Sequence, residues 1–237
     1  MGKFINENSP LWGFVKWLRT LLDRSGSLFW ANLLAMTALT PSWACLFFYG
    51  EKRNPLLLCG AVLGFALASP ALTALFFQCM QAVRENPMWV WDSFRDAYRK
   101  EFRKSFGFGL LVALLWMAYF WAAALVLGDG IANIVSLVGM TLSGVLLSGF
   151  SFFLFQQMAT VELSWQNVLR NGLLLVLAGK GRSLVVSLGA FAVVAASIWF
   201  SYLSWFVLML GALALLVMTG ELIFYPVFET LFLEVEN

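Results

Sequence analysis

The sequence predicts an all-helical protein that lies in a membrane, and three observations carry that prediction. Hydrophobic residues make up 61% of the 237 residues, and charged residues only 12%. The mean hydropathy is +0.83. Long stretches carry no ionised side chain, and such a side chain at bilayer depth costs about 3 kcal/mol or more. A soluble domain of this size could not hide so much apolar surface from water.

The composition excludes a soluble enzyme, a secreted disulfide-rich domain, a disordered linker and a nucleic-acid-binding domain. Lys and Arg number 15 and Asp and Glu 13, so the formal charge of +2 gives no reason to expect an anionic macromolecule as partner. Histidine is absent, which removes the commonest general acid–base group and metal ligand. The three cysteines, Cys45, Cys59 and Cys79, lie in apolar stretches and are expected to be buried thiols.

Uncharged windows define the membrane spans, because a helix needs about 20 residues to cross the hydrocarbon core. The window between Arg182 and Glu221 would form a helix of about 57 Å, so we expect two spans there, joined by a link at 201–204. Three interfacial aromatic residues would flank this link, namely Trp199, Tyr202 and Trp205. The six spans are expected at about 28–49, 56–83, 106–127, 131–158, 183–201 and 205–227. A single span in the long window gives a five-span alternative.

The cations are distributed unequally over the predicted loops. Of the fifteen Lys and Arg residues, only Lys52 and Arg53 lie on one side of the predicted membrane. The others precede the first span or lie between spans two and three or spans four and five. The positive-inside rule therefore places both termini and the long loops in the cytoplasm. The five-span alternative moves the acidic carboxyl-terminal tail to the outside.

Three segments outside the spans show an apolar and a polar face at helical spacing. We expect amphipathic helices at about 10–23, 88–104 and 162–178. Each precedes two spans, which favours three repeats of amphipathic helix plus transmembrane hairpin; chance similarity of short apolar segments is the alternative. The second segment carries five basic residues, Arg95, Arg99, Lys100, Arg103 and Lys104. We expect them to face anionic inner-leaflet headgroups, and a docking surface for a partner is the alternative.

Five polar residues within the predicted spans are the candidates for a functional role: Asn32, Gln78, Gln156, Gln157 and Glu221. Glu221 is the only acidic residue within an apolar span. As a functional residue it would carry a proton or a cation, with a glutamine as neighbour. The structural alternative pairs Glu221 with Arg182 or lets its side chain reach the inner interface.

No sequence motif indicates catalysis. The chain has no P-loop, dinucleotide-binding glycine pattern, metal-spaced cluster or nucleophile elbow. No two carboxylates lie within one helical turn at membrane depth. We therefore expect a non-enzymatic protein with no catalytic, cofactor-binding or metal-binding residue. An intramembrane enzyme that uses Asp, Glu and Ser is the remaining alternative.

Short motifs spread over most of the chain carry a family resemblance: Asn8–Trp12, Asn32 with Pro41, Ser69–Thr73, Ala82–Glu85, Phe94–Tyr98 and Trp165–Gly172. Together they resemble the YesL-like family of bacterial integral membrane proteins, a domain of unknown function. Members are commonly encoded beside carbohydrate uptake transporters. The resemblance therefore implies a bacterial plasma membrane and an accessory role in sugar import, and it implies no functional residues.

The expected function is an accessory or regulatory component associated with bacterial carbohydrate transport. Its partners would be the lipid bilayer and a carbohydrate transporter component, and a homo-oligomer is left open. The alternative is a small secondary transporter or permease that acts as an oligomer. The location of the buried polar residues distinguishes these two functions. Polar residues gathered around one water-filled cavity favour transport, and polar residues distributed over separate helix contacts favour the accessory role.

Overall fold

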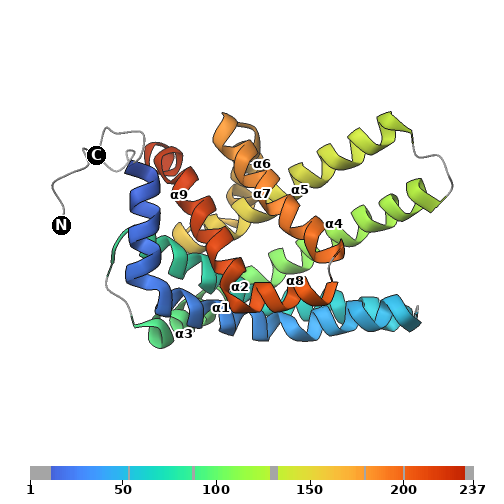
Figure 1. Cartoon of the computed structure of the whole chain (residues 1–237), viewed down its shortest axis with the longest axis horizontal. Coiled ribbons are helices and arrows are strands. Elements are labelled where there is room, and N and C mark those ends of the chain that lie inside the picture. Colours follow the sequence, from blue (N-terminus) through green and yellow to red (C-terminus); the bar gives the residue numbers. More distant parts are fainter. Residues whose placement is uncertain are drawn as a thin grey trace.

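A computed structural model describes residues 12–52, 54–86, 89–128, 133–178, 180–199 and 201–232. These ranges contain helices and no strand (Figure 1). The helices are α1 Trp12–Lys52, α2 Pro55–Val83, α3 Val90–Lys100, α4 Phe102–Gly128, α5 Ile134–Thr160, α6 Trp165–Ala178, α7 Lys180–Trp199, α8 Ser201–Val207, the π-helix η1 Leu208–Ala212, and α9 Leu213–Phe232. The helical class expected from the sequence is confirmed.

Five helical stretches are long and apolar enough to cross a membrane. They are Gly13–Gly50, Pro55–Val83, Phe102–Leu127, Ile134–Thr160 and Leu203–Val227. A sixth candidate is the pair Trp165–Leu177 and Gly181–Ser197, which is bent by 102° at the break between its two helices. The structure therefore has five or up to six candidate spans, as expected of a multi-pass membrane protein.

Local sequence signals explain where α2 and α5 begin and end. Asn54 caps α2 by accepting a hydrogen bond from the Leu56 amide at 3.0 Å, with Pro55 at the first helical position. Asn133 and Ser136 form a reciprocal capping box at the start of α5. At the end of α2, Glu85 adopts a φ of 59°, and the next amide donates to the Gln81 carbonyl. This is the left-handed helix end that glycine usually occupies.

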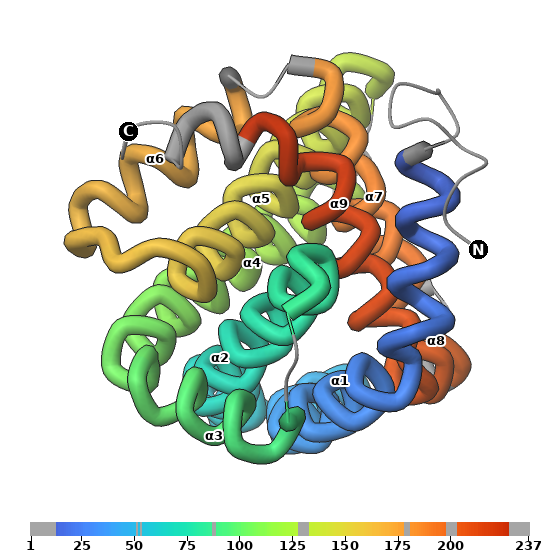
Figure 2. The backbone as a smooth tube through the Cα atoms, turned by 90° about the vertical axis from the view of Figure 1, so that its left-hand side faces the viewer, coloured from blue at the N-terminus to red at the C-terminus, as the bar shows by residue number. Residues whose placement is uncertain are grey.

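The first predicted amphipathic helix and the first predicted span form one helix, α1. Residues 10 and 11 of the predicted segment 10–23 lie outside the described residues. Figures 1 and 2 show that α1 changes direction after its first turns. Within α1, the hydroxyls of Ser25 and Ser27 donate to the carbonyls of Leu22 and Arg24 at 3.3 and 2.8 Å. Serine and glycine together bend a helix without ending it, and Gly26 lies between the two serines.

The other two amphipathic segments have different bounds from those expected. The predicted helix 88–104 is interrupted at Glu101, so that Arg103 and Lys104 belong to α4. Position 88 lies outside the described residues. The predicted helix 162–178 begins at Trp165, because Val161 is extended and the chain stays irregular up to Ser164.

The predicted link at 201–204 is itself helical in α8, and the separation between the candidate helices Gly181–Ser197 and Leu203–Val227 lies just before it. A further kink lies inside the second of these helices, in η1, where Gly211 has a φ of +124°. Glycine alone adopts this conformation at little cost, which explains why the kink lies at residue 211. Of the predicted aromatic belt, the Trp199 and Tyr202 side chains lie outside the described residues. Trp205 stacks on Trp43 of α1 with ring centroids 5.0 Å apart.

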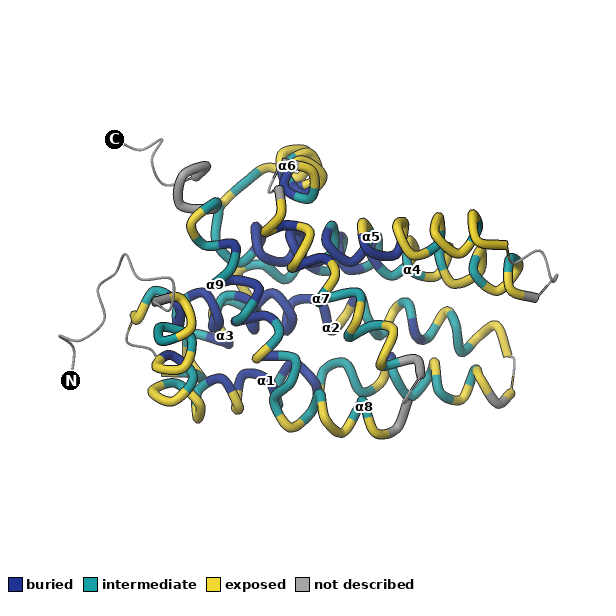
Figure 3. Tube along the Cα trace, turned by 45° about the horizontal axis from the view of Figure 1, so that its top comes forward, coloured by how far each residue is buried: buried dark blue, intermediate teal, exposed yellow. Residues whose placement is uncertain are grey.

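Burial is concentrated at one end of the molecule. Figure 3 shows buried residues where α2, α5 and α9 meet, whereas the far ends of α4 and α5 are exposed. Half of the residues in an apolar 18-residue stretch of α2 are buried, against 6% in the corresponding stretch of α4. A helix that is apolar all round and unburied by protein suits a lipid environment. The packed end of the bundle is therefore where the candidate site must be sought.

Candidate functional site

Asn32 is fully buried, and its amide group joins α1 to the kinked segment around η1. Its Nδ2 atom donates to the carbonyls of Leu208 and Met209, both at 2.9 Å. Its Oδ1 atom accepts from the Ala214 amide at 2.9 Å. A kink inside a membrane leaves backbone groups that must find partners within the protein. Asn32 supplies three such bonds, so its geometry is that of a structural clamp.

Glu221 of α9 is completely buried and accepts a hydrogen bond from Gln156 of α5. The distance from Gln156 Nε2 to Glu221 Oε2 is 2.7 Å. The Oε1 atom of each residue is buried and has no hydrogen-bond partner among the described residues. Cys79 and Arg84, at the end of α2, lie close enough to Glu221 for electrostatic interaction.

Both structural alternatives for Glu221 are therefore wrong. Its side chain is fully buried and hydrogen-bonded to Gln156, so it does not extend to the surface of the protein. Arg182 does not pair with it; this arginine is exposed at the start of α7. The neighbour of Glu221 is a glutamine, one of the three that the sequence analysis considered. An oxygen-rich buried pair of this kind can bind a proton, and the geometry alone does not assign that role.

The two remaining glutamines lie in separate contacts. Gln78 of α2 donates to Ser93 of α3 at 2.6 Å. Gln157 donates to the Phe153 carbonyl of its own helix at 3.0 Å, and its Oε1 atom has no partner among the described residues. The five candidates thus occupy four places in the fold, and only Gln156 and Glu221 meet. Four of them lie in three separate contacts between helices, and the hydrogen bond of Gln157 stays within α5.

Sequence reasoning missed two further polar contacts. Thr73 of α2 and Ser105 of α4 share a buried hydrogen bond of 2.8 Å. Trp17 of α1 donates from its indole to the Thr219 hydroxyl at 3.0 Å. Ser105 follows directly after a basic residue, so the sequence pattern assigns it to the interface rather than to a helix contact. No signal in the sequence pairs residues that are 202 positions apart, as Trp17 and Thr219 are.

The five basic candidates around α3 divide into two groups. Arg95, Arg99 and Arg103 are exposed. Lys100 forms a salt bridge of 2.5 Å with Glu162, and Lys104 donates to the Leu163 carbonyl. The hydrogen bond and charge of Lys100 lower the pKa of the Glu162 carboxyl below its ordinary value. The same bond raises the pKa of Lys100. Two of the five cations are thus engaged by the loop before α6.

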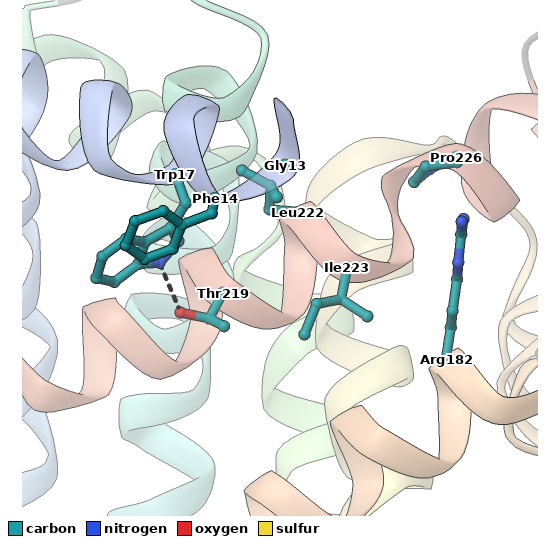
Figure 4. Close-up of a pocket in the computed structure, with 8 residues that line it drawn as sticks. All are labelled: Gly13, Phe14, Trp17, Arg182, Thr219, Leu222, Ile223 and Pro226. Carbon is teal, nitrogen blue, oxygen red and sulfur yellow. Dashed lines mark hydrogen bonds between the residues drawn. The ribbon is translucent and has the colours of Figure 1, made fainter. Parts of the chain in front are cut away.

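Two cavities lie at the packed end of the bundle. One, of about 540 Å³, has lining residues from α2, α3, α5 and the 161–164 loop, including Lys100, Asp96, Glu101 and Glu162. The other, of about 570 Å³, is a groove between α1, α7 and α9 (Figure 4). Glu221 lines neither. Within the described ranges, no three His, Cys, Asp or Glu side chains gather as metal ligands.

These features are those of an all-helical protein with five or up to six helices able to cross a membrane, in which some buried polar residues join helices. Residues 27–122 match the model of a family described as "Protein of unknown function, DUF624". Asn32, Gln78 and the basic residues around α3 lie inside the matched segment, whereas Gln156 and Glu221 lie outside it. Comparison with the curated proteins and with the solved structures finds no match.

Proposed function

We propose that the protein is a non-enzymatic accessory or regulatory component associated with carbohydrate transport in a bacterial plasma membrane. The observation that carries this proposal is the scatter of the candidate polar residues. Asn32 and Gln78 each serve a contact between helices. Glu221 lines neither of the two cavities. The resemblance to the YesL-like family supplies the link to sugar import, and the matched family itself has no known function.

The proposal includes a topology of six spans with cytoplasmic termini. The first part of α1, α3 and α6 would lie on the inner face, each followed by a transmembrane hairpin. Two features support three such units: the order of short and long helices, and the separation of the three short segments around the periphery in Figure 2. The distribution of Lys and Arg supports the orientation.

The exposed cations of α3 and of the start of α4 would form the surface that contacts lipid and the transporter component. Arg95, Arg99 and Arg103 have no carboxylate partner among the described residues. Trp89 and Trp91 beside them are 84% and 63% exposed. Tryptophan and arginine are the residues that dominate protein interfaces and also favour the inner-leaflet interface. One surface can therefore rest on lipid and contact a transporter component.

A deletion strain tests this proposal. We expect slower growth on one or a few carbohydrates, rescued by the wild-type chain but not by Arg95→Gln/Arg99→Gln/Arg103→Gln. Lys52→Gln, a single-charge change on the proposed outer face, should rescue fully. Affinity purification in native lipid should recover a transporter component with the wild type and lose it with the triple variant. The proposal would be contradicted if the deletion strain grew normally on every carbon source and the purification recovered no transporter component.

A specific observation favours a second candidate function, a small secondary transporter acting as an oligomer. The Gln156–Glu221 pair leaves two buried oxygens without partners among the described residues. Such oxygens can receive a proton or a cation. Glu221→Gln should then abolish proton-coupled uptake in proteoliposomes, while Gln78→Leu should leave it intact. Unaltered flux in Glu221→Gln would exclude this candidate.

A further inference from the structure

The groove between α1, α7 and α9 combines apolar walls with one cation. Phe14 of α1 and Leu222 and Ile223 of α9 form its apolar part, and Arg182 of α7 stands at the other side (Figure 4). Its volume is about 570 Å³, within the range of roughly 300–1,000 Å³ that small-molecule sites occupy. Its α9 residues lie in the last turns of the candidate span Leu203–Val227.

The two polar side chains that line this groove differ in whether they already have a partner. The Thr219 hydroxyl already accepts from the Trp17 indole, which closes that part of the wall to a polar ligand. Arg182 is exposed and pairs with no carboxylate among the described residues. Nearby, Lys16 lies 5.5 Å from the ring centre of Tyr225 and adds a second positive charge.

The second cavity shows that this charge pattern is particular to the groove. Around the second cavity, Lys100 is neutralised by Glu162, and Asp96 and Glu101 contribute further negative charge. No described carboxylate lines the groove beside Arg182. The groove therefore complements an anion that carries an apolar chain, whereas the carboxylates that line the second cavity disfavour an anion there.

We infer that this groove binds one anionic phospholipid, with its phosphate on Arg182 and an acyl chain against Phe14, Leu222 and Ile223. A guanidinium holds a phosphate with two parallel hydrogen bonds. Basic recesses between membrane helices on the cytoplasmic side are typical sites for anionic headgroups. The inference depends on the proposed orientation only for the leaflet, and it holds whether the protein assists a transporter or transports by itself.

Native mass spectrometry of the full-length protein in detergent tests the inference with phosphatidylglycerol and phosphatidylcholine. We expect one phosphatidylglycerol to bind at least about tenfold more tightly than phosphatidylcholine, because one charge-assisted pair is worth about this factor. Arg182→Gln should remove the difference between the lipids, and Arg182→Lys should restore part of it. Arg95→Gln, an equal loss of charge outside the groove, should leave the difference unchanged. Ile223→Trp should fill the groove and weaken both lipids.

Thermal unfolding of each variant shows whether the fold is intact, and the Arg182→Gln side chain is exposed, so we expect no loss there. Equal binding of phosphatidylglycerol by wild type and Arg182→Gln would overturn the inference. Displacement of the lipid by inorganic phosphate alone would also overturn it, since the apolar walls would then contribute nothing. If phosphatidylglycerol binds only after Glu234→Gln/Glu236→Gln, the acidic tail is the occupant and the inference fails.

Discussion

The contact around Asn32 and the contact around Glu221 are both completely buried, yet their polar atoms are satisfied to different degrees. The Asn32 side chain makes three hydrogen bonds, all to backbone groups beside the kink at Gly211. The Gln156–Glu221 pair makes one hydrogen bond and leaves an oxygen on each residue without a partner in the described part of the chain.

This difference teaches how to read a polar residue inside a membrane. Backbone groups freed by a kink cannot be removed by mutation, so the residue that satisfies them is indispensable to the fold. Two side chains that bond to one another can be replaced together, so the fold does not require such a pair. Asn32 belongs to the first kind and Glu221 to the second.

The largest expected effect is that of Asn32→Leu. This change removes the side-chain partner of two half-buried carbonyls and one buried amide, and we expect a loss of about 2–4 kcal/mol in unfolding free energy. Unfolding in mixed micelles with increasing denaturing detergent measures it. Thr37→Ala is the matched control on the same helix, because Thr37 bonds only to the preceding turn and is exposed. Equal stability of Asn32→Leu and the wild type would contradict the clamp.

The Gln156–Glu221 contact should respond differently to single and double changes. Gln156→Leu removes the one donor to a buried carboxyl, so we expect a loss of about 1–3 kcal/mol. Gln156→Leu/Glu221→Leu should recover most of it, since no polar group is then left without a partner. The double-mutant cycle in the same micelles gives both values. Additive losses would show that the two side chains are not energetically coupled and would contradict this expectation.

The kink itself gives a smaller effect. Gly211→Ala places a side chain at a φ of +124°, where no described atom lies within 4 Å of the added carbon. We therefore expect the unfolding free energy to fall by about 1–2 kcal/mol, entirely because of the backbone conformation. Gly189→Ala is the control, because its added carbon meets only Leu216 at 3.9 Å and α7 is helical there. We expect Gly189→Ala to be neutral or stabilising by up to about 1 kcal/mol. Equal effects at the two glycines would argue against a strained kink.

The sequence predicts which of these residues are buried but not what they contact. Asn32 and Glu221 are conspicuous because each interrupts an apolar stretch, and that signal is local. Their partners are 176 or more and 65 positions away, and such pairings depend on how the helices pack. The helix at 201–204 has a related explanation, because serine and tyrosine form helix readily when packing favours it. The kink at Gly211, inside the span that follows, was not predicted, since a single glycine in an apolar stretch does not indicate a φ of +124°.

The smallest expected effect lies outside the membrane, at the exposed pair of Lys100 and Glu162. Lys100→Gln should raise the pKa of the Glu162 carboxyl toward its ordinary value, which carbon-13 NMR of the carboxyl group measures. The folded pKa is lowered, so the pair stabilises the fold above the ordinary pKa and this contribution is lost as the pH falls through the lowered value. Both side chains are largely exposed, so salt should weaken the effect. Arg99→Gln, the control, should leave the pKa of Glu162 unchanged. If Arg99→Gln shifted this pKa as much as Lys100→Gln does, the net positive charge of α3, and not the hydrogen bond from Lys100, would set it.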